Sequence, residues 1–231
     1  MLKQFTIYTP THTYQWDTHP KVNILGGGNM SGKTWMLDTI HKNITDIIWC
    51  EDTDSNFECV MPYLTPYVVY IKPQPTFKHL TELMFNFKVA DWMTPLDMLL
   101  INRMITHLNK NTTVSPELLK SIRRFIPEFN PSDMSLTHVP DMSSGEKQLL
   151  YLLLCVEDTI GDSPLILLDS PETYLHIDWQ EQLIRELTNL NPNAQFIIST
   201  HAPSLISGYY DQVKEINQLI IDDRTDEDTS D

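Results

Sequence analysis

A glycine-rich segment at residues 27–34, GGNMSGKT, restricts the fold of this chain more than any other feature. It fits the pattern G-x-x-x-x-G-K-(S/T), follows the apolar run VNIL and precedes a segment that we expect to be helical. The glycines let the backbone curl so that successive N–H groups point inward at phosphate oxygens, and the helix adds the positive end of its dipole. Lys33 is then expected to reach the β- and γ-phosphates of a nucleotide, and Thr34 to bind Mg²⁺. The candidate residues of this nucleotide site are Gly27, Gly28, Asn29, Met30, Ser31, Gly32, Lys33, Thr34 and the adjoining Trp35.

A second motif, PLILLD at residues 164–169, is an apolar run that ends in an acid. A buried strand that presents one carboxylate at its carboxyl end can hold the Mg²⁺ of the same nucleotide. Taken alone, an aspartate after an apolar run would be interpreted as part of a surface turn. Together with the glycine-rich segment, it predicts that Asp169 is a magnesium ligand.

Strand-like and helix-like segments alternate along the chain, which argues for an α/β fold with a mainly parallel sheet. The expected strands are 4–8, 21–25, 46–50, 67–72, 164–169, 195–199 and 216–222, and the expected helices are 32–43, 143–159 and 177–189. From about residue 79 to 141 the apolar residues recur at helical spacing, which predicts a helical lobe inserted into the sheet domain. We therefore expect one domain over 1–221, with its core at 1–78 and 142–221, and an acidic tail at 222–231.

Charge and composition exclude several classes of protein. The formal net charge is −15, and binding of a DNA duplex depends mainly on Lys and Arg, so direct DNA binding by this chain is expected to be absent or weak. The longest apolar run, LLYLLLCV, has eight residues where a membrane span needs roughly 20, so no segment is expected to cross a bilayer. We see neither a signal peptide nor a disulfide or metal spacing among the three cysteines, and we therefore expect a cytoplasmic protein.

Two further motifs narrow the class. The sequence MSSGEKQ at 142–148 opens an expected helix, and FIISTH at 196–201 is an expected strand that ends in a histidine. Together with the first two motifs they resemble the ABC class of ATPases. The run from Asp169 to Gln180, DSPETYLHIDWQ, is similar to that of the soluble AAA/ABC-type ATPases related to the overcoming-lysogenisation-defect, RecF-like and Septu or retron-associated defence proteins. The resemblance covers residues 1–205. It implies a P-loop NTPase fold of the ABC type, with a mainly parallel central sheet, an N-terminal antiparallel β part and an inserted helical lobe.

The resemblance also implies roles for individual residues. Gln74 stands where the family has a glutamine that contacts Mg²⁺ and the attacking water, and His201 stands where it has a histidine that binds the γ-phosphate. The signature segment, which we define as Ser143, Ser144, Gly145 and Glu146, would contact the γ-phosphate of ATP held by a second subunit. His176 would belong to a loop that crosses the dimer interface. The implied active unit is a head-to-tail homodimer that encloses two ATP molecules.

The chain departs from the family at the position after Asp169. The family has a glutamate there that orients or deprotonates the attacking water, and here the residue is Ser170. A hydroxyl is a poor general base, and the loss of such a base costs about 10²–10⁴-fold in rate. We therefore expect slow hydrolysis, unless Glu172 or a partner supplies the base. Met30 stands where the family usually has glycine, and it makes the loop stiffer. Tyr14 and Trp16 are the candidates for stacking on adenine.

Three functions fit these observations. The first is a dimerising ATPase that switches a partner effector, for example a nuclease, in defence or DNA maintenance. The segment after His201 is too short for a nuclease domain, so we expect the effector to be a separate polypeptide. The second is a non-hydrolysing ATP sensor or regulatory subunit, which Ser170 favours. The third is the nucleotide-binding subunit of an ABC transporter, against which stand Leu175-His176 and the sequence SSGEKQ.

Overall fold

The computed structural model describes residues 1–50, 55–61, 68–72, 97, 100–101, 103–105, 107, 114–130 and 139–223. They fall into two compact units. The first contains Met1–Tyr70, Asp162–Ser170 and Asn193–Asp231, and the second contains Ile71–Gly161 and Pro171–Pro192. Among the described residues, no helix is both long and apolar enough to span a membrane.

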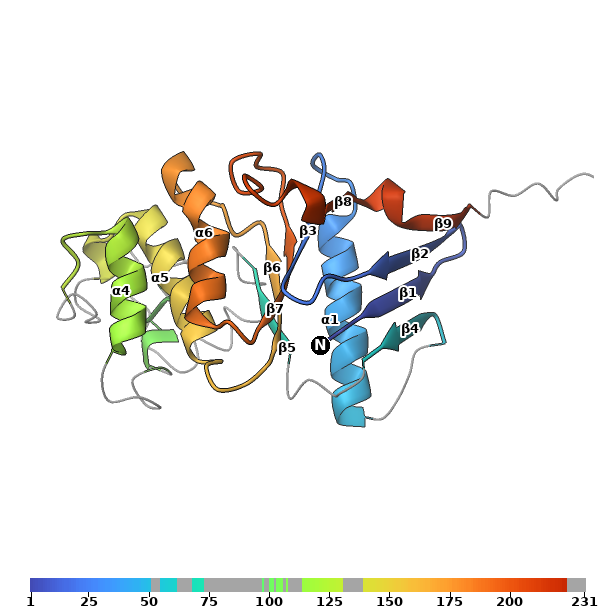
Figure 1. The fold of residues 1–231 in the computed structure, drawn as a ribbon, viewed down its shortest axis with the longest axis horizontal. Coiled ribbons are helices and arrows are strands. Elements are labelled where there is room, and N and C mark those ends of the chain that lie inside the picture. Colours follow the sequence, from blue (N-terminus) through green and yellow to red (C-terminus); the bar gives the residue numbers. More distant parts are fainter. Residues whose placement is uncertain are drawn as a thin grey trace, which may run out of the picture. The chain divides into compact units, whose positions relative to one another are not determined.

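The first unit holds an antiparallel sheet in the order β4-β1-β2-β9 (Figure 1). Its strands are β1 (Gln4–Tyr8), β2 (His12–Asp17), β4 (Phe57–Val60) and β9 (Ile220–Asp223). The rings of Phe5 and Trp16 face each other across β1 and β2, and their centroids lie 5.9 Å apart. Both side chains are buried, so this sheet contributes to the hydrophobic core of the unit.

A five-stranded sheet of order β5-β6-β7-β3-β8 lies in the same part of the chain. Its strands are β3 (Val22–Gly26), β5 (Val68–Ile71), β6 (Leu165–Asp169), β7 (Gln195–Ser199) and β8 (Val213–Glu215). Every residue of β3, β6 and β7 is buried, as expected for parallel strands covered on both faces. These three strands and β8 run parallel, so the carboxyl ends of β3, β6 and β7 meet at one edge of the sheet.

Helix α1 (Lys33–Cys50) begins within the glycine-rich motif and packs against β6 and β7. Its apolar side chains Ile40, Ile44 and Ile47 recur every three or four residues and pack in or against the core. The strand expected at 46–50 is therefore wrong, because Ile47 extends the helical stripe rather than starting a new element. The strand expected at 216–222 is only partly right, since a short 3₁₀ helix, η4 (Ile216–Leu219), precedes β9.

Three helices of the second unit pack on one another, namely α4 (Pro116–Phe125), α5 (Ser144–Glu157) and α6 (Ile177–Leu190). Among the described residues, two further short 3₁₀ helices are η2 (Val139–Asp141) in this unit and η3 (Tyr210–Gln212) in the first. Most of the expected helical lobe, 79–141, lies outside the described residues, so the lobe and the domain boundaries stay predictions.

Candidate nucleotide-binding site

The glycine-rich segment joins the buried strand β3 to the first turn of α1. Three of its residues have left-handed backbone conformations, with φ of 128° at Gly27, 62° at Met30 and 89° at Gly32. Glycine adopts such angles without steric cost, whereas a residue with a Cβ pays roughly 1–2 kcal/mol. At Gly32 an added Cβ would also lie 3.3 Å from Cδ1 of Ile216. The chain therefore curls tightly here, and Met30 holds its conformation with a fully exposed side chain.

Lys33 lies inside this curl. Its Nζ donates hydrogen bonds to the carbonyl oxygens of Gly27 at 2.8 Å and Gly28 at 2.6 Å, and lies 3.1 Å from the hydroxyl of Ser31. The side chain is buried, with 7% of its surface exposed. The loop thus surrounds a cation with its own oxygens, which is the position from which an ammonium group can reach phosphates bound to the loop.

Thr34 and Asp169 bring the two sequence motifs into contact. The Thr34 hydroxyl donates to Oδ2 of Asp169 over 2.9 Å, at the carboxyl end of β6. A hydroxyl, a carboxylate and phosphate oxygens are the hard oxygen ligands that Mg²⁺ prefers, and the ion keeps several waters besides. The donor set therefore fits a nucleotide-bound Mg²⁺. Among the described residues no cluster of three or more His, Cys, Asp or Glu side chains could hold a metal by itself, so the phosphates would have to complete the coordination.

Two residues that the sequence analysis missed adjoin Asp169. The hydroxyl of Ser199, which is fully buried at the end of β7, donates to Oδ1 of Asp169. The pKa of the Tyr70 hydroxyl, on β5, is raised mainly by burial. The negative charges of Asp169 and Asp38 raise it further. Parallel pairing places Ser199 opposite Asp169, and that register was the one signal that could have pointed to Ser199.

Ser170 follows Asp169 with a left-handed φ of 47°. Its backbone N–H donates to the carbonyl oxygen of Ser199 at 2.9 Å. His201 lies two residues beyond Ser199 and is exposed, so the first unit places it at the same edge of the sheet as Asp169. Glu172 belongs to the second unit and is buried, and Gln74 lies outside the described residues.

Aromatic side chains lie beside the start of α1. The ring of Trp35 is 5.5 Å from that of Tyr14 on β2, and Tyr14 is in turn 5.8 Å from His12. Trp35 is 41% exposed, whereas Trp16 is 3% exposed and packs on Phe5. Of the two candidates for adenine stacking, Trp16 is therefore unsuited because it belongs to the core. Tyr14 and Trp35 present the accessible rings.

The signature segment forms the amino end of α5 in the second unit. Ser143 is the N-cap, and Glu146 completes a capping box with it. Oε2 of Glu146 accepts hydrogen bonds from both the backbone N–H and the hydroxyl of Ser143, each at 2.7 Å. Ser143 and Ser144 are exposed at this helix terminus, where the dipole is positive, and the Glu146 carboxylate occupies both Ser143 donors.

Gly145 is the point of closest packing in the signature segment. A Cβ there would lie 3.0 Å from the carbonyl oxygen of Tyr174 and 3.7 Å from the ring of Trp179. Tyr174 has a φ of 67°, and it and Ile177 expose 52% and 56% of their surfaces. His176 between them is the N-cap of α6, since its Nδ1 accepts from the N–H of Asp178. The second unit thus holds the signature segment against a loop with exposed apolar side chains.

Comparison with known proteins agrees with this geometry. Residues 96–207 match the family described as "AAA domain, putative AbiEii toxin, Type IV TA system". The chain is also 33% identical over 92 residues to the Retron Vc95 probable ATPase of Vibrio cholerae, and 31% identical over 95 residues to the Septu protein PtuA of Bacillus thuringiensis. These alignments cover 39% and 34% of the chain but 18% and 22% of the relatives, so the chain spans less than a quarter of their length.

Solved structures show the same fold at low identity. A nucleotide-free ATP-binding cassette of an ABC transporter superposes with a TM-score of 0.50 at 15% identity, over 96% of this chain and 90% of that one. An SMC head bound to the C-winged helix domain of ScpA gives 0.50 at 12% identity, over 89% and 91%. The expected fold class, a P-loop NTPase of the ABC ATPase type, is therefore confirmed.

Proposed function

We propose that this chain binds Mg²⁺-ATP, dimerises around it and thereby switches a partner effector, with slow hydrolysis as a timer. The observation that carries the proposal is the hydrogen bond from Thr34 to Asp169, with the Lys33 ammonium in the adjoining loop. This bond joins the glycine-rich segment to the Asp169 carboxylate at the carboxyl edge of a parallel sheet, which is where such sheets bind ligands. The 33% identity to a retron ATPase and 31% to a Septu protein supports a role in defence.

Exposed apolar side chains support dimerisation. Met30 stands fully exposed on the phosphate loop, and Tyr174 and Ile177 stand exposed after β6. In a head-to-tail dimer the phosphate loop of one subunit would face the signature segment of the other. The exposed amino end of α5, with Ser143 as its cap, would then meet the γ-phosphate. Dimerisation would bury these apolar residues around the two nucleotides. Their exposure in the single chain is therefore consistent with an interface at this surface.

A separate effector protein, such as a nuclease, is the partner that this function needs. The Septu and retron relatives are longer than the chain, and a switch that only closes and opens must act on something. Direct DNA contact is not required, since the net charge of −15 opposes it.

A non-hydrolysing ATP sensor is the second candidate, and Ser170 favours it. A serine follows the metal carboxylate where a general base would be needed, and burial separates Glu172 from bulk water. The two candidates share ATP binding and dimerisation and differ only in turnover. A transporter subunit is the third candidate, and no observation of this structure favours it.

Sedimentation velocity with and without Mg²⁺-ATP tests the proposal. We expect a dimer only with nucleotide, and its loss in Lys33→Ala and in Ser143→Arg. Lys42→Ala, an exposed lysine farther along α1, and Ser163→Arg, at the opposite edge of the sheet, are the matched controls and should still dimerise. A Ser143→Arg variant that dimerises like the wild type would refute the trans contact. Steady-state hydrolysis of the wild type beside Lys33→Ala then separates the slow ATPase from the sensor.

A further inference from the structure

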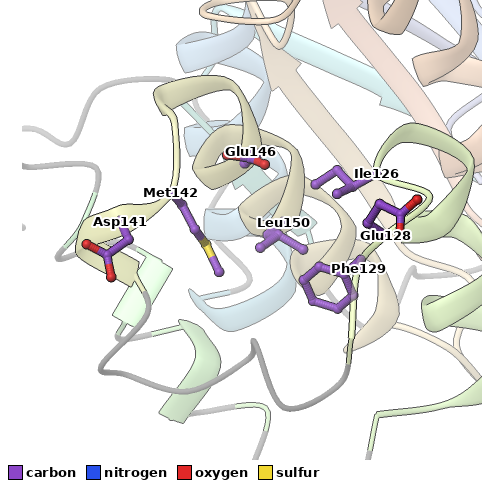
Figure 2. A pocket seen from close by; sticks show the side chains of 7 residues that line it. All are labelled: Ile126, Glu128, Phe129, Asp141, Met142, Glu146 and Leu150. Carbon is purple, nitrogen blue, oxygen red and sulfur yellow. The ribbon is translucent and has the colours of Figure 1, made fainter.

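A pocket of about 260 Å³ lies in the second unit beside the signature segment (Figure 2). Its apolar lining comes from three elements or their ends, with Ile126 and Phe129 following α4, Met142 preceding α5, and Leu150 within α5. Figure 2 shows these side chains grouped between the helix and the two flanking loops. The cavity is large enough for one extended side chain of a bound protein segment.

Carboxylates surround this apolar lining. Glu128, Asp141 and Glu146 also line the pocket, and Glu128 and Asp141 are exposed. None of the lining residues that the structure describes is basic. Arg123, whose Nε donates to the carbonyl oxygen of Phe129, is not part of the lining. An apolar floor with three acids around it complements a long side chain that has a methylene stem and a cationic head, as in arginine or lysine.

Glu146 belongs both to this pocket and to the signature segment. Its Oε2 accepts from the N–H and from the hydroxyl of Ser143, both at 2.7 Å. In that state the two Ser143 donors are engaged, and a carboxylate lies where an anion would have to approach. A cation bound in the pocket would attract the Glu146 carboxylate and release both donors.

We propose that the pocket receives an arginine or lysine from an apolar segment of a partner protein, and that this draws Glu146 away from Ser143. Occupancy of the pocket then prepares the signature segment to bind the γ-phosphate of the second subunit. The coupling rests on the proposed function, whereas the pocket's preference for a cationic side chain does not. Because coupling between two sites is reciprocal, nucleotide-bound dimers bind the basic segment more tightly than free subunits do.

The binding step can be tested without nucleotide. The probes are a short blocked peptide of alternating leucine and arginine, and a matched peptide with glutamate in place of arginine. We expect the arginine peptide alone to bind the full chain in calorimetry, to shift the methyl resonance of Met142, and to bind more weakly as salt is raised. The double variant Glu128→Gln/Asp141→Asn should weaken binding about tenfold, because each ion pair near a surface is worth up to about a factor of five.

The matched control is Glu181→Gln, an exposed acid on α6 that does not line the pocket. It should bind the arginine peptide like the wild type. Equal binding of the glutamate peptide, an unshifted Met142 methyl group, or a double variant that binds like the wild type would each overturn the pocket assignment. All the substituted acids are exposed, so a failure to fold is not expected to obscure the result.

The coupling step is tested by sedimentation with Mg²⁺-ATP. The arginine peptide should lower the ATP concentration needed for dimerisation several-fold in the wild type and have no effect in Glu146→Gln. Peptide binding without this shift, in a chain that dimerises with ATP, would refute the coupling. A chain that never binds ATP or dimerises would instead refute the proposed function, and the pocket would still be judged by the nucleotide-free titration.

Discussion

Ser199→Ala tests the geometry of the candidate metal site directly, since sequence reasoning gave Ser199 no role. The side chain is fully buried, and its hydroxyl donates to Oδ1 of Asp169. The substitution removes one oxygen atom and leaves the backbone pairing of β6 and β7 in place. Among the described residues, the Thr34 hydrogen bond would then remain on the other oxygen of Asp169, which is itself 7% exposed.

The expected cost follows from the charge of the acceptor. A hydrogen bond to an ionised group contributes about 1.5–3 kcal/mol, and a buried carboxylate oxygen cannot recover that interaction from bulk water. We therefore expect Ser199→Ala to lower the free energy of unfolding by about 2 kcal/mol. If Asp169 binds the Mg²⁺ of ATP as we propose, the metal ion would also stabilise the carboxylate, and with Mg²⁺-ATP the loss should fall to about 1 kcal/mol or less.

The assay is residue-specific hydrogen exchange, because two units need not unfold together. Amides of β6 and β7, and the N–H of Ser170 that donates to Ser199, report the local opening free energy with and without Mg²⁺-ATP. The matched control is Ser207→Ala, an exposed serine that should change the opening free energy by less than about 0.5 kcal/mol. A similarly small effect of Ser199→Ala would show that this hydroxyl does not hold Asp169.

Three further predictions concern Trp35 beside the glycine-rich segment, Gly145 in the signature segment and Glu157 at the end of α5. Trp35→Ala should weaken ATP binding about tenfold in calorimetry while inorganic triphosphate binds as before, and an equal loss of affinity for both ligands would refute stacking by Trp35. Trp16→Ala should instead lower the free energy of unfolding in urea by about 3–5 kcal/mol. Gly145→Ala should destabilise the second unit by about 1–2 kcal/mol in urea, since its Cβ would lie 3.0 Å from the carbonyl oxygen of Tyr174, and an unchanged midpoint would contradict this. Burial raises the pKa of Glu157, so the stability that it contributes at acid pH is lost as pH rises above about 4.5. Glu157→Gln should remove that loss, and an unchanged pH profile of unfolding would refute it.

The elements that sequence reasoning predicted well are those with a strong local signal. Strands β1 and β7 coincide with the expected strands, and β6 begins one residue later than expected. The apolar runs within β6 and β7 are recognisable from sequence because these parallel strands are buried on both faces. The run at 46–50 was misjudged because a few apolar residues fit a strand and a helix end equally well. Only its continuity with Ile40 and Ile44 on the core face of α1 distinguishes the two.

The candidate site divides in the same way. Lys33, Thr34 and Asp169 each belong to a motif of consecutive residues, so the sequence alone makes them candidates, and their roles in binding stay predictions. Ser199 and Tyr70 were not predictable, since their place beside Asp169 depends on which strands neighbour β6. Trp16 was a candidate for stacking on adenine, but the packing of β1 on β2 buries it against Phe5, which residue type alone could not reveal.

Substitution of Ser170 distinguishes a slow ATPase from a non-hydrolysing sensor. The backbone conformation at this position should tolerate the substitution. The left-handed φ of 47° and the N–H bond to the Ser199 carbonyl are set by the main chain and not by the side chain. A glutamate at this position would meet the same backbone cost as the serine does, so Ser170→Glu should fold and present a carboxylate next to Asp169. General-base catalysis contributes about 10²–10⁴-fold, and even a poorly aimed carboxylate should raise steady-state ATP hydrolysis more than tenfold. Ser170→Gln, with the same shape and no basicity, should give no gain. If glutamine accelerates hydrolysis as much as glutamate, or if the wild type already turns over as fast as Ser170→Glu, the serine is not what limits the rate.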